Sequence, residues 1–476
     1  MNSYMEFIQA EIGGLYGQEL IREMNEIINL YNFYDGIGQE WATEDEDYVP
    51  TKKKTNYVKK LIKEESRFLF GKTPEFVIKS NNNSEEDNIK EQELTKYINK
   101  ILTENLFSDK LVKAARDCFI GKRVAIKLHA DKERKTIKIM FLPSLEFIYE
   151  PFEDNQDELK KIVFFYNTND EVDRENQRVW KQKYEMINGS CYLTEGIYNG
   201  FGQLLEEIST DVNLQLSGIP AYIVINDGLT GDMRGESDVF ELMDNQINYN
   251  KMSSEDIDTL RKGMNRIIYG VDVDPEASDK FQIKPGAFWD VVTDSTALEG
   301  KQAVINTIGT DFGYNEKIQE TLKRTKADMY ELLNIPNLNT DDLKGVMTSG
   351  KSMKALYWQL VTRCEEKMMS WRPALIWMVE AILELTRVYN IESIPELTDY
   401  EVIIDNQYPL QEDEDEEIAL DLQKVNAQAM SKKTFIKKWQ GVTDEVAEEE
   451  LRQIALEREM LEESYSSMQV DEGINE

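Results

Sequence analysis

A helical pattern runs from residue 351 to residue 389 and is the longest element that the sequence predicts. At 1.5 Å per residue this helix would span roughly 60 Å, far more than the helices of ordinary globular domains. Pro373 lies near its middle, and because a proline removes a backbone hydrogen bond, we expect a kink there. An apolar strand follows at 400–404, so residues 351–411 are predicted to form a long kinked helix and a returning strand.

Two further helical patterns, 234–265 and 311–334, enclose a small β-like insert at 266–310. Ser237 can cap the first helix, and Pro336 forbids continuation of the second. Helices of similar length on either side of an insert predict an antiparallel stalk that carries a small module at its tip.

The first 233 residues combine helices with a sheet. Helical spacing near the N-terminus changes to a period of two after residue 123, which predicts strands. Asn, Asp and Gly turns separate the runs 136–141, 146–149, 161–167, 178–185 and 190–198. The fold class is therefore α+β, with a mixed sheet, helices at its flank and an acidic helical region over 412–476.

The charge of the chain limits its partners. Its 476 residues include 55 Lys and Arg against 90 Asp and Glu, a formal net charge of −35. This balance argues against wrapping nucleic acid in a basic surface. We expect neither a secretion signal nor a membrane-spanning helix, because no basic-then-apolar start and no uninterrupted apolar run is present.

Few residues are available for catalysis or metal binding. Cys118, Cys191 and Cys364 lack paired or metal-type spacing, which predicts buried thiols in a reducing compartment. The only histidine, His129, lies in a strand-like run. Histidine metal sites and Ser/His or Cys/His catalysis therefore lack the histidines they would need. We therefore expect no enzyme activity, no catalytic residue, no cofactor and no metal.

Residues Gly345 to Ser352 match the phosphate-loop pattern G-x-x-x-x-G-K-[ST] letter for letter. Such a loop needs a buried strand that ends at its first glycine, whereas 334–344 is polar and contains Pro336. A strand ending in Asp405 keeps a nucleotide-binding ATPase open as an alternative. An acidic structural scaffold is a second alternative, which the insert between paired helices argues against. We favour a loop that binds no nucleotide.

The order of these parts resembles the portal proteins of long-tailed bacteriophages. No single phrase is specific to that family, but their order is. The phrases are Tyr34-Asp35-Gly36, Asn56-Tyr57, Phe70-Gly71-Lys72-Thr73-Pro74, Gly235-Glu236-Ser237-Asp238, Ser349-Gly350-Lys351-Ser352-Met353-Lys354, Ser431 to Thr434, Val442-Thr443-Asp444-Glu445 and Glu448-Glu449-Glu450.

The resemblance implies a portal-like architecture with named parts. These are a mixed α/β wing over 1–233, a two-helix stem over 234–265 and 311–334, a small α/β clip over 266–310, a tunnel loop over 335–350, a long kinked wing helix with its strand over 351–411, and a helical crown with an acidic tail over 412–476. About twelve copies typically form a ring in that family.

The same resemblance implies a function. It implies a DNA channel at one capsid vertex of the virion, assembled in the host bacterial cytoplasm, through which double-stranded DNA is packaged and ejected. The implied partners are further copies of the chain, that DNA, the terminase motor, a head-tail adaptor, and the major capsid and scaffolding proteins, with no membrane. Twelve copies would carry a formal charge of about −420, so an acidic lumen would repel phosphates and let DNA slide.

Candidate contact residues follow from the implied parts. The tunnel loop would face DNA, with sparse lysines as transient contacts or as ordinary solvated charges; its residues are Asn339, Thr340, Asp341, Asp342, Lys344, Met347 and Lys351. The clip would dock the motor and the adaptor near Phe281, Lys284 and Trp289, although Phe281 and Trp289 fit the core of the small module better.

Overall fold

A computed structural model of the chain describes residues 15–41, 49–82, 84–169, 171, 173–264, 267–274, 291–296, 302–308, 313, 315–338, 350–410, 414–444 and 446–457. These residues form an α+β fold, as the sequence predicts. The chain divides into two compact units. The first comprises Met1–Asn337 and Trp358–Pro409, and the second comprises Leu338–Tyr357 and Leu410–Glu476.

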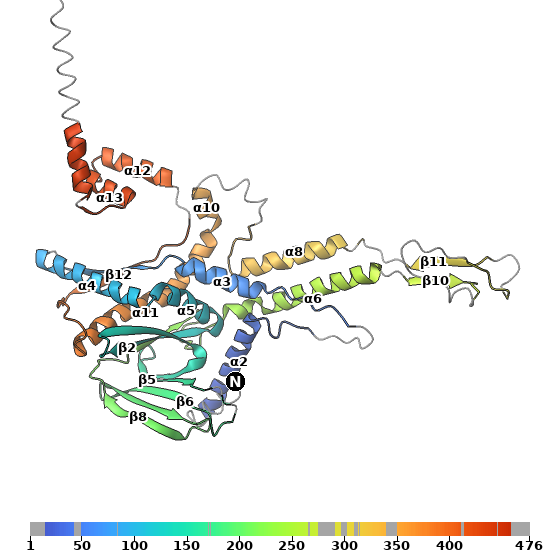
Figure 1. Ribbon diagram of the computed structural model, residues 1–476, viewed down its shortest axis with the longest axis horizontal. Helices are drawn as coiled ribbons and strands as arrows, with labels where there is room; N and C mark the ends of the chain where they lie inside the picture. Colours follow the sequence, from blue (N-terminus) through green and yellow to red (C-terminus); the bar gives the residue numbers. More distant parts are fainter. Residues whose placement is uncertain are drawn as a thin grey trace, which may run out of the picture. The chain divides into compact units, whose positions relative to one another are not determined.

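Two antiparallel sheets form most of the β-structure of the first unit (Figure 1). The three-stranded sheet has the order β3-β2-β9 and the five-stranded sheet the order β4-β5-β6-β7-β8. The strands are β2 (Arg123–Asp131), β3 (Thr136–Pro143), β4 (Phe147–Pro151), β5 (Leu159–Asn167), β6 (Val179–Ile187), β7 (Ser190–Tyr198), β8 (Leu204–Asn213) and β9 (Ala221–Ile225). All strand pairs among the described residues are antiparallel, so the expected mixed sheet is wrong. Strands β4 to β8 pair in chain order through turns, which join antiparallel neighbours.

The β6–β7 hairpin shows how local sequence determines this pairing. Ile187 pairs with Ser190, which leaves Asn188 and Gly189 as a two-residue turn. Their φ angles are 51° and 76°. A turn with two positive φ angles matches the right-handed twist of the strands it joins, and Asn-Gly is the dipeptide that favours it.

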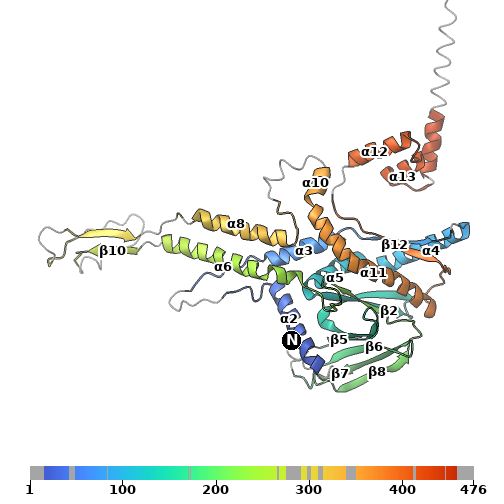
Figure 2. The ribbon, with the colours of Figure 1, turned by 180° about the vertical axis from the view of Figure 1, so that it is seen from behind.

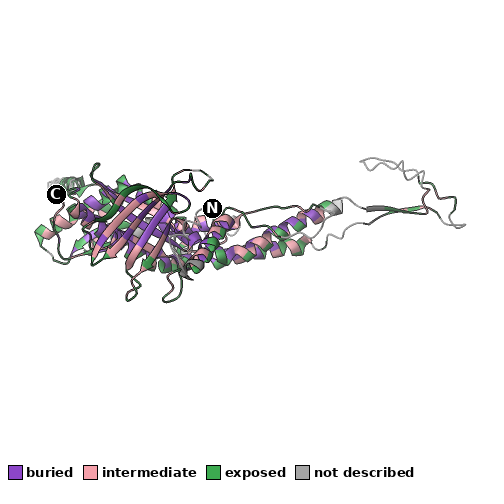
Figure 3. Ribbon diagram, turned by 90° about the horizontal axis from the view of Figure 1, so that it is seen from below, coloured by how far each residue is buried: buried purple, intermediate pink, exposed green. Residues whose placement is uncertain are grey.

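Strand β2 lies in the core and is covered on both faces. Helices α5 (Phe107–Gly121) and α11 (Trp358–Val388) pack on the three-stranded sheet. On the other face, the Lys127 ammonium lies 4.7 Å from the ring centroids of both Phe164 in β5 and Trp180 in β6. Residues 123–128 are therefore all buried instead of alternating between core and solvent. Figure 3 shows buried segments within the strands of the sheets.

Three helices and a two-stranded ribbon complete the N-terminal part. The helices are α2 (Leu15–Tyr34), α3 (Tyr57–Phe70) and α4 (Glu85–Glu104), and α3 is capped by Asn56, which accepts from the N–H of Lys59. Strand β1 (Glu75–Ser80) pairs antiparallel with β12 (Tyr400–Asp405), which follows α11. The sequence patterns predict β12 but not β1.

Helices α6 (Asp238–Met264) and α8 (Asn315–Leu332) lie side by side as an antiparallel hairpin (Figures 1 and 2). Gln319 of α8 donates to Asp256 of α6 at 3.0 Å. Between the helices the chain forms an antiparallel pair of short strands, β10 (Ile267–Val271) and β11 (Val304–Ile308). The predicted pair of helices around a β-containing insert is thus present.

The predicted long helix is divided. Helix α10 (Gly350–Leu356) belongs to the second unit, and α11 (Trp358–Val388) belongs to the first, with Tyr357 between them. A single helix over 351–389 is therefore wrong. The N–H of Tyr357 still donates to the carbonyl of Met353 at 3.1 Å, so the interruption is confined to this residue. Pro373 lies inside α11 as expected.

The second unit contains the C-terminal helices α12 (Glu414–Asn426) and α13 (Lys432–Gln440), with a further helical segment over 446–457. Asp421 of α12 accepts from Lys438 Nζ at 2.7 Å and from Trp439 Nε1 at 3.3 Å, which fastens the two helices together. The helical character expected after residue 412 is confirmed for these residues.

Candidate functional site

Four charged side chains from three helices meet inside the first unit. Glu65 lies on α3, Asp238 is the first residue of α6, and Arg363 and Lys367 lie one turn apart on α11. Glu65, Asp238 and Lys367 have exposed fractions of only 0%, 1% and 3%. We call these four residues the ionic junction.

Arg363 bridges the two carboxylates of the ionic junction. Its Nε donates to Glu65 Oε1 at 2.8 Å, and its Nη2 donates to Asp238 Oδ1 at 3.0 Å. A guanidinium holds its donors in fixed directions, so it can bind two separate carboxylates at once. One arginine of α11 thereby ties α3 to the start of α6.

Lys367 directs its ammonium group into a polar cage. The Nζ atom donates to Asp238 Oδ2 at 2.9 Å, to Asn226 Oδ1 at 2.8 Å and to Asp227 Oδ2 at 3.2 Å. The ring centroid of Phe119 lies 4.3 Å away. Since Asn226 and Asp227 follow β9, the lysine also fastens the end of the three-stranded sheet to the helices.

The start of α6 favours a negative charge at Asp238. The N-terminus of a helix carries a partial positive charge, which stabilises a carboxylate there. Ser237 caps the helix, because the N–H of Val239 donates to its hydroxyl at 3.3 Å. That hydroxyl donates in turn to the carbonyl of Ile120 at 2.7 Å. The cap predicted at Ser237 is therefore confirmed.

The ionic junction shifts the proton affinities of its own members. Burial, followed by the charge of Asp238, raises the pKa of the Glu65 carboxyl to about 7. Burial alone would lower the pKa of Lys367, but Asp238 and Glu65 raise it above its ordinary value. Glu65 Oε2 has no hydrogen-bond partner within the described part of the chain. Each cation therefore depends on the carboxylates around it.

This arrangement suits a clamp between helices. Its cations are surrounded by acceptors, and the neighbouring thiols of Cys118 and Cys364 are buried, which raises the pKa of both. All three cysteines of the chain are free and buried, as the sequence predicts. Within the segments that the structure describes, no three His, Cys, Asp or Glu side chains could together hold a metal ion.

A second polar feature runs along α6. The extended stretch 51–57 lies against one face of the helix, and every second residue of the stretch donates its backbone N–H to a side chain of α6. The pairs are Thr51 to Asp258 at 2.8 Å, Lys53 to Ser254 at 2.9 Å, Thr55 to Asn250 at 3.0 Å and Tyr57 to Gln246 at 2.8 Å. We call Gln246, Asn250, Ser254 and Asp258 the polar ladder.

The hydrogen bonds of the polar ladder can form in a row because the repeat distance of the extended stretch nearly equals that of the helix. Two residues of an extended chain advance roughly 6.6 Å, and four residues of a helix advance about 6 Å. One side chain per helical turn can therefore meet one N–H per two extended residues. The ladder residues are buried, and these bonds satisfy polar groups that would otherwise be costly to bury.

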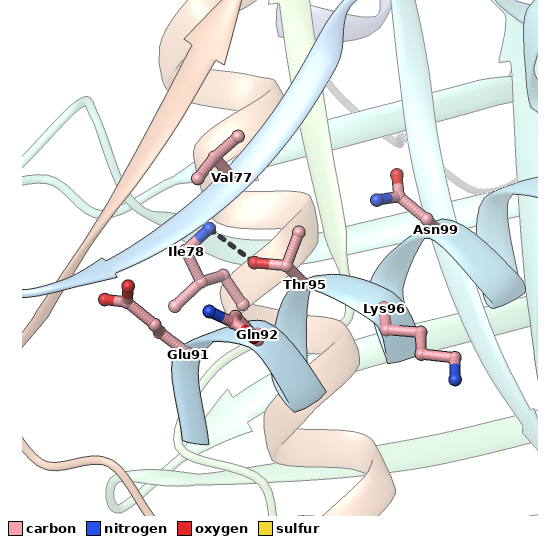
Figure 4. Close-up of a pocket in the computed structure, with 7 residues that line it drawn as sticks. All are labelled: Val77, Ile78, Glu91, Gln92, Thr95, Lys96 and Asn99. Carbon is pink, nitrogen blue, oxygen red and sulfur yellow. Dashed lines mark hydrogen bonds between the residues drawn. The ribbon is translucent and has the colours of Figure 1, made fainter. Parts of the chain in front are cut away.

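A hollow with a volume of about 410 Å³ lies between β1 and α4 (Figure 4). The N–H of Ile78 donates across it to Thr95 Oγ1 at 3.0 Å, and the N–H of Ser80 donates to Glu91 at 2.8 Å. Side chains of α4 thus satisfy the free edge of β1. The hollow is therefore a gap beside a structural contact between these two elements.

The predicted contact residues fall almost entirely outside the described residues. This applies to the clip residues Phe281, Lys284 and Trp289 and to the loop residues Asn339, Thr340, Asp341, Asp342, Lys344 and Met347. Lys351 lies in α10, but its side chain is not among those described. The structure therefore does not test whether these side chains lie together, and their roles stay predictions.

The described residues nearest the phosphate-loop pattern do not form the elements of a nucleotide site. Residues 339–344, directly before the pattern, lie outside the described residues; residues 335–338 form no strand, and α10 has only seven residues. Asp405 ends β12, which pairs antiparallel with β1, whereas a nucleotide site of this kind requires βαβ units with a parallel sheet.

The sequence contained signals for both polar features. The ladder residues recur every four positions within a helix, and Arg363 and Lys367 have the same spacing on a largely apolar helix. Such rows indicate a buried polar stripe, but the sequence does not identify the segment that each stripe meets.

Comparison with known proteins relates the whole arrangement to one family. A family model described as "Phage portal protein, SPP1 Gp6-like" matches residues 16–464. The match includes the helical hairpin, the ionic junction and the polar ladder. No curated protein matches the chain.

Proposed function

This chain belongs to the phage portal protein family, and we propose that about twelve copies of it close into a ring around an axial DNA channel. Portal proteins are structural components of a capsid vertex that act as an oligomeric ring in DNA packaging. The match over residues 16–464 carries the proposal. In this proposal, double-stranded DNA enters the capsid during packaging and leaves it at ejection through the same channel.

The helical hairpin supports an assignment of parts. We assign the stem to α6 and α8, and the clip to the intervening chain over 266–310. The remaining parts are a wing over 1–233 and 351–411, a tunnel loop over 335–350, and a crown with an acidic tail over 412–476. The stem is supported by the observed packing of α6 on α8, because a hairpin of two long helices can carry an insert away from the sheets.

Contact sites are proposed on the loop and the clip. The loop residues, from Asn339 to Lys351, would face the DNA. The clip, near Phe281, Lys284 and Trp289, would dock the terminase motor and later the head-tail adaptor. The major capsid and scaffolding proteins would surround the ring in the host bacterial cytoplasm, where the particle assembles. None of the described helices is both long and apolar enough to cross a membrane.

The strong negative charge would serve transport. A channel lined by carboxylates repels phosphates, so DNA has no deep binding minimum in which to stop. In this proposal the chain itself performs no reaction, and the motor that docks on it supplies the work of packaging.

We expect the purified chain to form closed rings with a central hole and a mass of about twelve subunits. Negative-stain microscopy shows the hole, and mass photometry gives the number of copies. A protein that remains monomeric at micromolar concentration across several salt concentrations would overturn the proposed ring.

We also expect the chain to bind no ATP. Isothermal titration with Mg-ATP should give no heat of binding, and Lys351→Ala should leave both the rings and the thermal unfolding unchanged. ATP binding that Lys351→Ala abolishes would instead establish a phosphate-binding loop at Gly345 to Ser352.

A further inference from the structure

Residues 49–72 are basic within a strongly acidic chain. They include eight Lys and Arg and only two Glu, a net charge of +6, whereas the whole chain carries −35. The segment comprises the stretch held by the polar ladder and helix α3. Positive charge is therefore concentrated on one part of the first unit.

Helix α3 presents this charge on its outer face. It buries Leu61 and Glu65, while Lys60, Lys63 and Arg67 follow one another at spacings of three and four on another face. Lys60 donates to Tyr330 of α8 at 2.7 Å. Among the described residues, no ion pair involves Lys63 or Arg67. We call Lys60, Lys63 and Arg67 the basic stripe.

Helix α6 presents the opposite charge. Glu241, Asp244 and Glu255 are exposed and recur on one face, with Lys251 as the basic residue in the row. Phe240, at the start of this face, is 66% exposed. Neither Asp244 nor Glu255 forms an ion pair with another described residue. We call Phe240, Glu241, Asp244 and Glu255 the acidic face.

The two surfaces do not meet within one copy. The stretch that leads into α3 lies against the polar ladder, where the N–H of Tyr57 donates to Gln246. The acidic face lies on a different side of α6, because Asp244 lies two positions before Gln246 and Glu255 one position after Ser254, and residues at those spacings do not face each other on a helix. One copy therefore exposes two surfaces of opposite charge that it cannot bring together itself.

We propose that the basic stripe of one copy docks on the acidic face of a second copy of this chain. The inference rests on the ring proposed above and identifies the surfaces that form it. In a ring, two different surfaces of the same chain must meet at each contact. Since each copy carries −35, unlike charges at this contact offset the repulsion between copies and define their register. The contact also covers Phe240.

Double-stranded DNA is the rival occupant of the basic stripe, and the residues argue against it. Glu64 lies on the same face of α3 and pairs with Lys60 at 3.6 Å. Only Lys63 and Arg67 then offer unpaired charge there. Two such charges make few phosphate contacts, whereas tight DNA binding depends on many.

A charge-reversal experiment tests the contact. Lys63→Glu with Arg67→Glu reverses the stripe, and Asp244→Lys with Glu255→Lys reverses the acidic face. We expect each double variant alone to raise the concentration for half-maximal ring assembly at least about tenfold. A mixture of the two variants should assemble near the wild-type concentration, because every contact in an alternating ring then joins unlike charges. Mass photometry measures both.

The control carries the charge change of the stripe variant at another place in the chain. Lys96→Glu with Lys113→Glu, on α4 and α5, should assemble as the wild type does. The proposed contact would be overturned if either reversal variant formed rings at the wild-type concentration, or if mixing the two folded variants did not restore ring assembly.

If stripe variants formed normal rings but retained less DNA, the stripe would be a DNA-binding surface instead. A wild-type chain that forms no rings would overturn the proposed function itself. Circular dichroism shows whether each variant is folded, and Lys63→Gln with Arg67→Gln replaces a reversal that does not fold.

Discussion

Replacing Lys367 by methionine is expected to lower the free energy of unfolding by about 3–5 kcal/mol. The substitution keeps most of the volume of the side chain but removes the ammonium group that Asp238, Asn226 and Asp227 surround. Asp238 is 1% exposed, so water cannot replace the lost charge without opening the core. Denaturant unfolding at one protein concentration measures the loss, because assembly makes stability depend on concentration.

Two companion variants separate loss of charge from loss of packing. Arg372→Met removes an exposed cation from the same helix and should change stability by no more than about 0.5 kcal/mol. Adding Asp238→Asn to Lys367→Met should recover part of the loss, since the uncompensated carboxylate is then gone. If Lys367→Met is as stable as Arg372→Met, the ionic junction does not hold the helices together.

Periodicity made much of the fold predictable. The helical hairpin was recognised because apolar residues keep helical spacing on both sides of the insert, and Pro336 marks the end of its second helix. Six strands of the two sheets, β2 to β7, were predicted from alternation and turn residues. In each of these cases the signal lies within the element itself.

Elements that depend on distant contacts were not predictable. Strand β1 was not predicted from its own six residues, and its position depends on pairing with β12, which lies more than 300 residues later in the chain and was predicted only as an isolated apolar strand. Strand β8 is an edge strand whose residues are nearly all exposed, so it lacks the alternation of core and solvent. The ionic junction posed the same problem, because its residues come from three helices that are distant in sequence.

The proposed tunnel loop, residues 335–350, would lie beside the passing DNA, so its charge should influence transport. A double substitution in this loop is expected to stall packaging. Asp341→Lys with Asp342→Lys changes the charge by +4 per chain, or by about +48 in a ring of about twelve copies. Positive charges in a channel attract phosphates and release their counterions, which creates binding minima along the path. We expect rings to assemble normally while heads fill only in part, as measured by the length of packaged DNA.

Salt distinguishes this mechanism from a simple structural defect. Because added salt shortens the range of attraction, raising ionic strength should restore packaging by rings of the double lysine variant, while a misassembled ring would gain nothing. A control with Asp341→Asn and Asp342→Asn removes the acidic groups without adding cations and should stall packaging much less. Full-length packaging at the wild-type rate in low salt, by rings shown to carry both substitutions to lysine, would mean that the loop does not face the DNA or that its charge has no influence on transport.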